Sequence, residues 1–323
     1  MLRKLSLIKW LLLAGILAAA VILVLNRDKV YDYYRGLIYK PSSEMVKIRD
    51  SLGLTTEGEF VFNASQPVLS ERDEFNANCR EDDAETAILG CYTMENIYVY
   101  NIEDEQLTGI RELTAAHELL HAVFARMDDN EKNALRGDLQ TVLKNNGEIL
   151  QEDLSIYSTE EQFEELYVRA GTEVKKLPDN LEKHYAKVFK DQDKVVSFYD
   201  SYIAVFRRLK AELKALESEL DELNSRIDSM TLEYETRARQ YSTDVDQFNA
   251  CADTAGCFGS QWEFDTRRNV LVNEQVALDA MYDEITNLVN EYNDKVKVYN
   301  NDVIETNRLN DKINSNIKPK EME

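Results

Sequence analysis

A heptad pattern of apolar residues runs through the last third of the chain and restricts that part to long helices. Between residues 209 and 248 the apolar side chains recur in alternating steps of four and three, which places them along one seam of a helix. The members are Leu209, Leu213, Leu216, Leu220, Leu223, Ile227, Met230, Tyr234, Tyr241, Val245 and Phe248. The pattern predicts a coiled-coil helix whose register continues past Arg237.

A second apolar seam follows a glycine-bearing break at residues 251–260. It contains Leu271, Leu278, Met281, Ile285, Leu288, Tyr292, Val296, Tyr299 and Val303. Because the connection is short, the two helices most simply fold back on each other. We therefore expect a long antiparallel coiled-coil hairpin at residues 199–318, followed by a tail at 319–323. Such a hairpin would bind a protein partner, mediate self-association, or act as a spacer.

The four cysteines fall into two local pairs, Cys79 with Cys91 and Cys251 with Cys257. An even number in local pairs is compatible with two disulfides in a protein outside the cytosol. The second disulfide would close the tip of the hairpin. The net charge of −22, from 38 basic and 60 acidic residues, repels nucleic-acid phosphates. Nucleic acid is therefore excluded as a partner.

An apolar segment near the N-terminus, residues 5–25, contains only Ser6 and Lys9 as polar residues. A run of this length and composition predicts a transmembrane signal anchor. Residues 1–4 would form a cytoplasmic stub and residues 26–42 a juxtamembrane segment.

More basic residues precede the apolar run than follow it. The excess, carried by Arg3, Lys4 and Lys9, predicts a cytoplasmic N-terminus, so the body would lie outside the cytoplasm of a single-pass cell-membrane protein. A cleaved signal peptide is the alternative, because residues 18–20 are three alanines that suit a signal peptidase. Apolar residues continue to Leu25, which favours an uncleaved anchor.

The sequence of residues 43–198 predicts one domain that contains both helices and strands. Residues 86–102 are rich in β-branched and aromatic side chains and are interrupted by polar residues at 94–96, which predicts a β-hairpin. Val61 and Phe62, before Pro67, predict another strand. Helical patterns dominate elsewhere. The expected fold class is α+β, mainly helical.

The sequence His117-Glu118-Leu119-Leu120-His121 contains two of the three histidines of the chain. An apolar stripe across residues 108–127 predicts a helix, with both histidines at the edge of its buried face. Two imidazoles four residues apart on a helix can bind one zinc ion, with the glutamate between them facing a water on the metal. The alternative is that both histidines are boundary residues of an ordinary amphipathic helix.

This motif, followed by a helical glutamate far downstream, resembles the gluzincin branch of the zinc metallopeptidases. The resemblance covers roughly residues 86–190 and implies a zincin-like fold, a zinc cofactor and a polypeptide substrate. It implies that Glu165 is the third metal ligand, with Glu173 and Glu164 as alternatives. On the helical wheel Glu173 borders the apolar stripe, whereas Glu165 lies nearly opposite. The segment departs from the family pattern at Arg169, where an acidic residue that orients a histidine is usual.

In such a site Glu118 is the expected catalytic base, which takes a proton from water and passes it to the leaving amine. The oxyanion also needs a donor. Tyr167, His184 and Tyr185 are candidates, and we rank His184 first. The alternative for His184 is a solvated residue on an amphipathic helix.

Two functions follow from the sequence. The first is a membrane-anchored zinc endopeptidase acting on envelope or extracellular polypeptides. The second is a non-enzymatic envelope scaffold, in which the coiled-coil hairpin binds a partner and zinc only stabilises the fold. Glu118→Gln would abolish the first function and leave the second intact.

Overall fold

The computed structural model describes residues 17, 21, 24, 26–79, 88–147, 150 and 159–315. These residues form a mainly helical fold with one three-stranded sheet, which agrees with the predicted α+β class. The chain divides into two compact units. The first contains the described residues up to Val205 and those from Leu309, and the second contains Phe206–Arg308.

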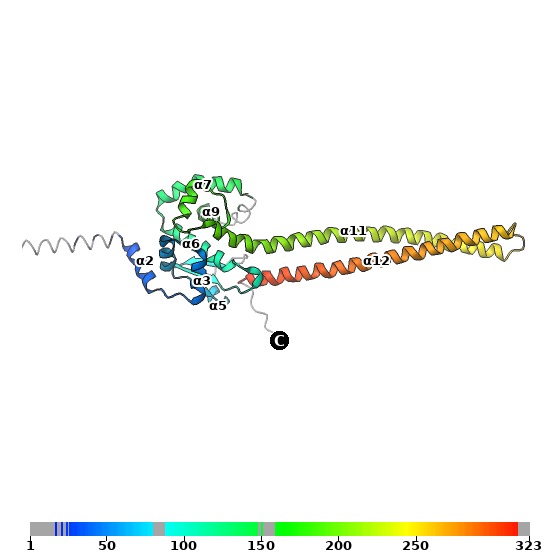
Figure 1. Cartoon of the computed structure of the whole chain (residues 1–323), viewed down its shortest axis with the longest axis horizontal. Helices are drawn as coiled ribbons and strands as arrows, with labels where there is room; N and C mark the ends of the chain where they lie inside the picture. Colours follow the sequence, from blue (N-terminus) through cyan, green and yellow to red (C-terminus); the bar gives the residue numbers. More distant parts are fainter. Residues whose placement is uncertain are drawn as a thin grey trace, which may run out of the picture. The chain divides into compact units, whose positions relative to one another are not determined.

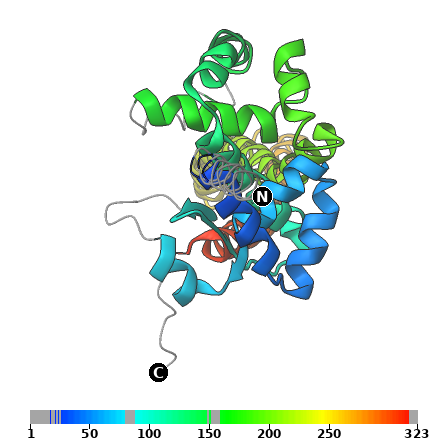
Figure 2. The ribbon, with the colours of Figure 1, turned by 90° about the vertical axis from the view of Figure 1, so that its left-hand side faces the viewer.

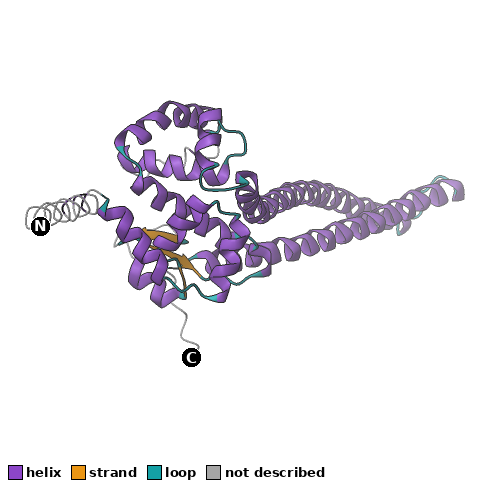
Figure 3. Ribbon diagram, turned by 60° about the vertical axis from the view of Figure 1, so that its left-hand side comes forward, coloured by secondary structure: helices purple, strands orange, loops and turns teal. Residues whose placement is uncertain are grey.

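The first unit packs helices around the sheet, whose strands are orange in Figure 3. Its central helix, α6, contacts the sheet and helices on both flanks, and Figure 2 shows α2–α4 (blue) apart from α7 and α9 (green). The helices are α2 (Arg27–Ile38), α3 (Ser43–Leu52), α4 (Thr56–Ala64), α5 (Arg72–Cys79), α6 (Ile110–Arg126), α7 (Asp129–Asn145), α9 (Thr159–Glu173) and α10 (Asp179–Tyr185), with a 3₁₀ turn at Glu105–Leu107.

The sheet has the order β1-β3-β2, with β1 (Val68–Ser70) parallel to β3 (Asn96–Tyr100). Strand β2 (Gly90–Thr93) is an edge strand and pairs antiparallel with β3, as the predicted hairpin requires. Residues 86 and 87 of that prediction lie outside the described residues. Among the described residues β2 pairs with β3 alone, so its other edge has no strand beside it there.

The turn between β2 and β3 holds two non-glycine residues in the left-handed region, Met94 at φ 47° and Glu95 at φ 63°. Two-residue hairpin turns of this kind favour Asn-Gly, because side chains beyond glycine are strained there. Arg35 of α2 stabilises the turn: its guanidinium donates to the Glu95 carbonyl at 2.9 Å and to Asn96 Oδ1 at 2.7 Å.

Glu95→Gly is expected to raise the free energy of unfolding by about 0.5–1 kcal/mol, because it removes the left-handed strain of one side chain. Urea unfolding of the full chain measures this change. Glu103→Gly is the matched control, since Glu103 is an exposed loop residue whose φ is not positive, and it should give no gain. An equal or smaller stability for Glu95→Gly than for the unmodified chain contradicts the prediction.

The second unit is a pair of long helices, α11 (Gln192–Ala252) and α12 (Gln261–Ile313), each of which also extends into the first unit (Figure 1). They run antiparallel, because contacts between them join early α11 to late α12. Glu219 pairs with Lys295 and Arg237 pairs with Glu274. Leucines of the predicted seams, Leu223, Leu278 and Leu288 among them, are buried between the helices.

Both cysteine pairs form as predicted. Cys79–Cys91 links α5 to β2, and Cys251–Cys257 closes the connection between α11 and α12.

The structure corrects the membrane prediction. No helix among the described residues is both long and apolar enough to cross a bilayer. Helices α11 and α12 have the length, but charged side chains recur along both. This finding overturns the predicted signal anchor and the single-pass membrane location. Most of segment 5–25 lies outside the described residues, as do residues 1–4 and 319–323.

The strand predicted at Val61 and Phe62 is also wrong. Both residues lie in α4 and are buried there. The helix begins because the Thr55 side chain accepts a hydrogen bond from the Gly58 amide, which is an N-cap. The nearest strand is β1, which starts after Pro67.

Candidate metal centre

The motif histidines lie one turn apart on α6, the predicted helix. Their Nε2 atoms are 3.3 Å apart, and the two rings meet edge to face. The side chain of His117 is 24% exposed and that of His121 is 19% exposed. Both nitrogens therefore face the same point, and both side chains are partly exposed.

Glu165 of α9 completes a group of three donors. One carboxylate oxygen lies 3.6 Å from His117 Nε2, and the other lies 3.4 Å from His121 Nε2. Each residue offers one ligand atom, and the three atoms lie within 4.8 Å of one another. Tetrahedral zinc with bonds of about 2.0–2.1 Å separates its ligand atoms by roughly 3.3 Å. Two imidazole nitrogens and one carboxylate at these separations fit zinc in donor type and spacing.

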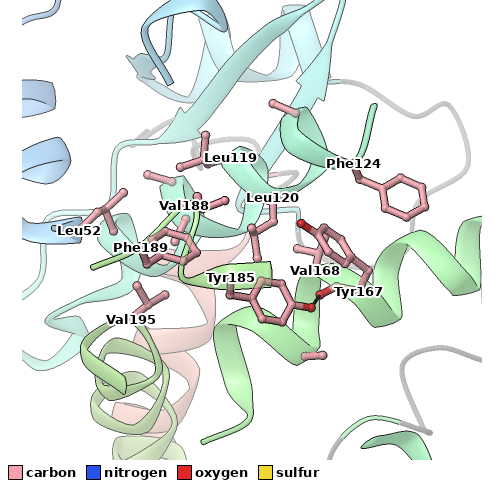
Figure 4. Close-up of a cluster of buried hydrophobic side chains, with 14 of the residues drawn as sticks. Leu52, Leu119, Leu120, Phe124, Tyr167, Val168, Tyr185, Val188, Phe189 and Val195 are labelled. Atoms are coloured by element: carbon pink, nitrogen blue, oxygen red, sulfur yellow. Dashed lines mark hydrogen bonds between the residues drawn. The ribbon is translucent and has the colours of Figure 1, made fainter. Parts of the chain in front are cut away.

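Close packing of α9 on α6 brings Glu165 to the histidines. A Cβ atom added at Gly171 of α9 would lie 2.5 Å from Leu120 Cδ1 and 2.7 Å from the Tyr185 ring. Only glycine allows this approach. Leu120, Tyr167 and Tyr185 pack together in the core, as Figure 4 shows.

Glu173, the first alternative ligand, is engaged elsewhere. The Arg169 guanidinium donates to both of its carboxylate oxygens, at 2.9 and 3.0 Å. Both side chains are nearly buried. Arg169 occupies the position where the gluzincin pattern has an acidic residue. Its guanidinium is paired with the Glu173 carboxylate instead. The geometry favours Glu165 over Glu173 as the third ligand.

Glu164, the second alternative, contacts the other side of a histidine. The Nδ1 atom of His121 donates to Glu164 Oε1 at 2.7 Å, while Nε2 of the same ring faces Glu165. A carboxylate on the distal nitrogen fixes the tautomer and orientation of a metal-binding imidazole. Glu164 therefore supplies the orienting carboxylate that the sequence pattern lacks at Arg169.

Glu164→Gln is expected to weaken zinc binding by about 10–100-fold, because the amide does not provide the negative charge that orients His121 and increases its basicity. Competition with a fluorescent zinc chelator measures this affinity. Glu182→Gln, at an exposed position on α10, is the control and should leave the affinity unchanged. Equal affinities for Glu164→Gln and the unmodified chain exclude the orienting role.

Glu118 lies between the metal donors and the edge strand. It is buried, and burial raises the pKa of its carboxyl group above the ordinary value in spite of the neighbouring histidines. A Cβ atom added at Gly90 of β2 would lie 2.7 Å from Glu118 Oε1 and 2.5 Å from Thr114 Cγ2. Gly90 thus allows β2 to pass directly over the carboxylate. A buried carboxylate with a raised pKa is suited to accept a proton from water.

The start of β2 is held in place by distant parts of the chain. The disulfide Cys79–Cys91 fastens it to α5. Ser315 follows the end of α12. Its hydroxyl donates to the Ile88 carbonyl at 3.1 Å, and its backbone carbonyl accepts from the Asn76 side-chain amide at 2.8 Å. Ser315 is buried. These contacts fix the approach to Gly90 and so the strand that lies over Glu118.

Without metal, the neighbouring carboxylates favour the protonated forms of the two histidines. Burial alone would lower the pKa of His121, but hydrogen bonds to Glu164 and Glu165 outweigh it and raise that pKa to about 10. Burial likewise opposes protonation of His117, yet the Glu165 carboxylate raises its pKa above the ordinary value. Burial acts to raise the pKa of Glu165, but both histidines hold it far below the usual range.

Zinc binding at pH 7 is therefore expected to release about one proton or more per ion, because the metal displaces protons that the raised histidine pKa values retain. The zinc affinity should increase as the pH rises from 6 towards 9. Calorimetric titration in buffers of different ionisation enthalpy measures the protons released. Binding without proton release, or an affinity that is constant over this pH range, contradicts these pKa shifts.

The structure does not bring His184 to the three donors. Its Nε2 atom accepts a hydrogen bond from the Tyr167 hydroxyl at 3.0 Å. Tyr167 and Glu165 are two positions apart on α9, so they project about 200° apart around the helix. Burial, helped by Lys187, lowers the pKa of His184 to about 4, so the ring is neutral. Tyr167 and Tyr185 are fully buried, and the Tyr185 hydroxyl donates to the Tyr167 carbonyl.

Three comparisons of the chain with known proteins found no similar protein. No protein-family model matches the chain, no curated protein is similar to it, and no solved structure matches its fold. The described residues themselves give the kind of site: two histidines and one glutamate cluster beside a second, buried carboxylate and an edge strand.

Proposed function

We propose that this chain is a zinc-dependent endopeptidase of gluzincin-like chemistry. The observation that carries the proposal is the convergence of His117, His121 and Glu165 within zinc-binding distance, with Glu118 buried next to them. Structural zinc sites are closed by four protein ligands, so they need no further carboxylate such as Glu118 beside the metal. Three protein donors leave one position for a reacting water or substrate.

The edge of β2 is the proposed substrate-binding surface. The Tyr100 amide donates to the Leu89 carbonyl at 2.9 Å, and Cys91 and Thr93 are the next positions in the same alternation. In an antiparallel pair the intervening residues direct their backbone groups the other way. Gly90 and Tyr92 therefore offer N–H and C=O groups at the open edge. An extended polypeptide pairing there would lie alongside Glu118 with little dependence on its sequence.

The reaction assigned to these residues is amide hydrolysis. A zinc ion held by His117, His121 and Glu165 would polarise the scissile carbonyl and acidify a water. The Glu118 carboxylate accepts the water proton and then donates it to the leaving amine nitrogen. Glu164 keeps the His121 ring oriented throughout by its hydrogen bond to Nδ1. The backbone of Gly90 and Tyr92 holds the polypeptide in an extended conformation.

Incubation of the full-length protein with an unstructured polypeptide, followed by mass spectrometry of the products, tests this proposal. We expect internal cleavage, loss of cleavage after chelation, and recovery with one equivalent of zinc. Intact substrate with the zinc-loaded protein, across several unrelated polypeptides, would refute the peptidase proposal. That outcome, together with one bound zinc, would instead support the alternative of a scaffold stabilised by zinc.

A further inference from the structure

The connection between the two long helices contains contacting aromatic rings and a disulfide, and we name it the hairpin tip (residues 241–266). The rings of Phe248, Phe258 and Phe264 contact one another, with centroids 5.1–5.3 Å apart. The disulfide Cys251–Cys257 closes the loop beside them. Two antiparallel helices need only about two to five connecting residues. The tip therefore has more internal structure than the reversal of the chain requires.

The hairpin tip presents one large aromatic side chain to solvent. Trp262, in the first turn of α12, is 76% exposed, while the neighbouring Phe264 packs into the ring cluster. Tryptophan is enriched at the centres of protein interfaces, where its large apolar surface is covered by a partner. An exposed indole on a preorganised scaffold needs little further ordering when a partner binds.

The charge of the hairpin tip restricts the chemistry of that partner. The acidic residues of the segment are Asp244, Asp246, Asp253, Glu263 and Asp265. The segment itself has no lysine or arginine, and Arg239, Arg267 and Arg268 flank it, the first of them paired with Glu235. Glu263 is paired with Arg267. Asp246 and Asp253 are exposed, and neither forms an ion pair with any residue that the structure describes. A surface of this sign attracts cationic groups and repels nucleic acid.

We propose that the hairpin tip is a docking site for a lysine- or arginine-rich segment of another polypeptide. One cationic side chain stacks on the Trp262 indole, as cations do on exposed tryptophan rings. Flanking cations face Asp246 and Asp253. The tip complements such a segment in charge and offers it one aromatic anchor. This site is independent of zinc and goes beyond the proposed peptidase activity.

The test measures binding of a labelled, unstructured peptide of alternating lysine, arginine and glycine to the full-length protein at about 0.15 M salt, where surface charges act over roughly 8 Å. Fluorescence anisotropy gives the Kd. Trp262→Ala is expected to raise the Kd about fivefold or more. Val276→Ala is the matched control, because Val276 lies two heptads along the same face of α12, is 62% exposed, and should leave the Kd unchanged.

Changes in charge test the second half of the proposal. The double change Asp246→Asn with Asp253→Asn should also raise the Kd and reduce its dependence on salt. A matched peptide with glutamate in place of each cation should not bind. The proposal is overturned if Trp262→Ala binds as tightly as the unmodified chain, or if Val276→Ala loses as much affinity as Trp262→Ala. Circular dichroism of each variant shows whether the helices are retained.

Discussion

Glu118→Gln is expected to lower kcat/KM for polypeptide cleavage by about 10²–10⁴-fold while one zinc per chain remains bound. The amide has nearly the same size as the carboxylate in its buried position beside Gly90, but it cannot accept the water proton. Since Glu118 is not one of the three donors, metal content should not change. Cleavage assays and metal analysis of the same preparation measure both quantities.

Glu112→Gln is the matched control for this prediction. Glu112 lies in the first turn of the same helix, outside the donor group, and its variant should cleave at the unmodified rate. Undiminished cleavage by Glu118→Gln would remove Glu118 from the mechanism. Loss of zinc in that variant would instead show that the carboxylate helps to hold the metal.

Glu165→Gln is expected to weaken zinc binding by more than about 100-fold, whereas Glu173→Gln should keep the metal and lose stability. Loss of a ligand should exceed the 10–100-fold effect of losing an orienting neighbour. Glu173 pairs instead with Arg169, and both side chains are at most 10% exposed. Its removal takes away the carboxylate that faces a buried guanidinium, which is expected to lower the free energy of unfolding by about 3 kcal/mol.

Zinc titration and urea unfolding of the two variants separate these roles. The expected pattern is a large loss of zinc affinity in Glu165→Gln, and an unchanged zinc affinity with a lower free energy of unfolding in Glu173→Gln. The opposite pattern would make Glu173 the ligand. Equal zinc affinity in both variants and the unmodified chain would exclude both glutamates.

The elements with strong periodicity could be predicted from the sequence. Heptad spacing predicted both long helices, because a seam must be apolar all along its length to pack. The helix at His117 and the hairpin at β2 and β3 were also predicted, from an apolar stripe and from β-branched composition. The strand predicted at Val61 and Phe62 was wrong because β propensity alone is a weak signal. The threonine at position 55, which is the N-cap of α4, was the better indication of the local structure.

The third ligand could not be chosen from the helical wheel. The wheel assumes one buried face, but Glu165 and Glu173 are both largely buried because α9 is packed on more than one side. Only the tertiary structure shows that Arg169 takes Glu173 and that Glu164 contacts His121. The role of Gly90 was also missed, since a single glycine at the start of a strand gives no sign of the side chain that lies against it. The ranking of His184 rested on the need for an oxyanion donor, and that need does not specify the face of α9 on which the ring packs.

X-ray absorption at the zinc edge of the full-length protein tests the central claim most directly. Two imidazoles from α6 and one carboxylate from α9 predict one zinc per chain, with nitrogen and oxygen neighbours at about 2.0–2.1 Å and outer-shell scattering from two rings. Glu165→Gln should remove this zinc. Sulfur neighbours at about 2.3 Å, scattering from fewer than two imidazoles, or a chain that binds no zinc would contradict the account.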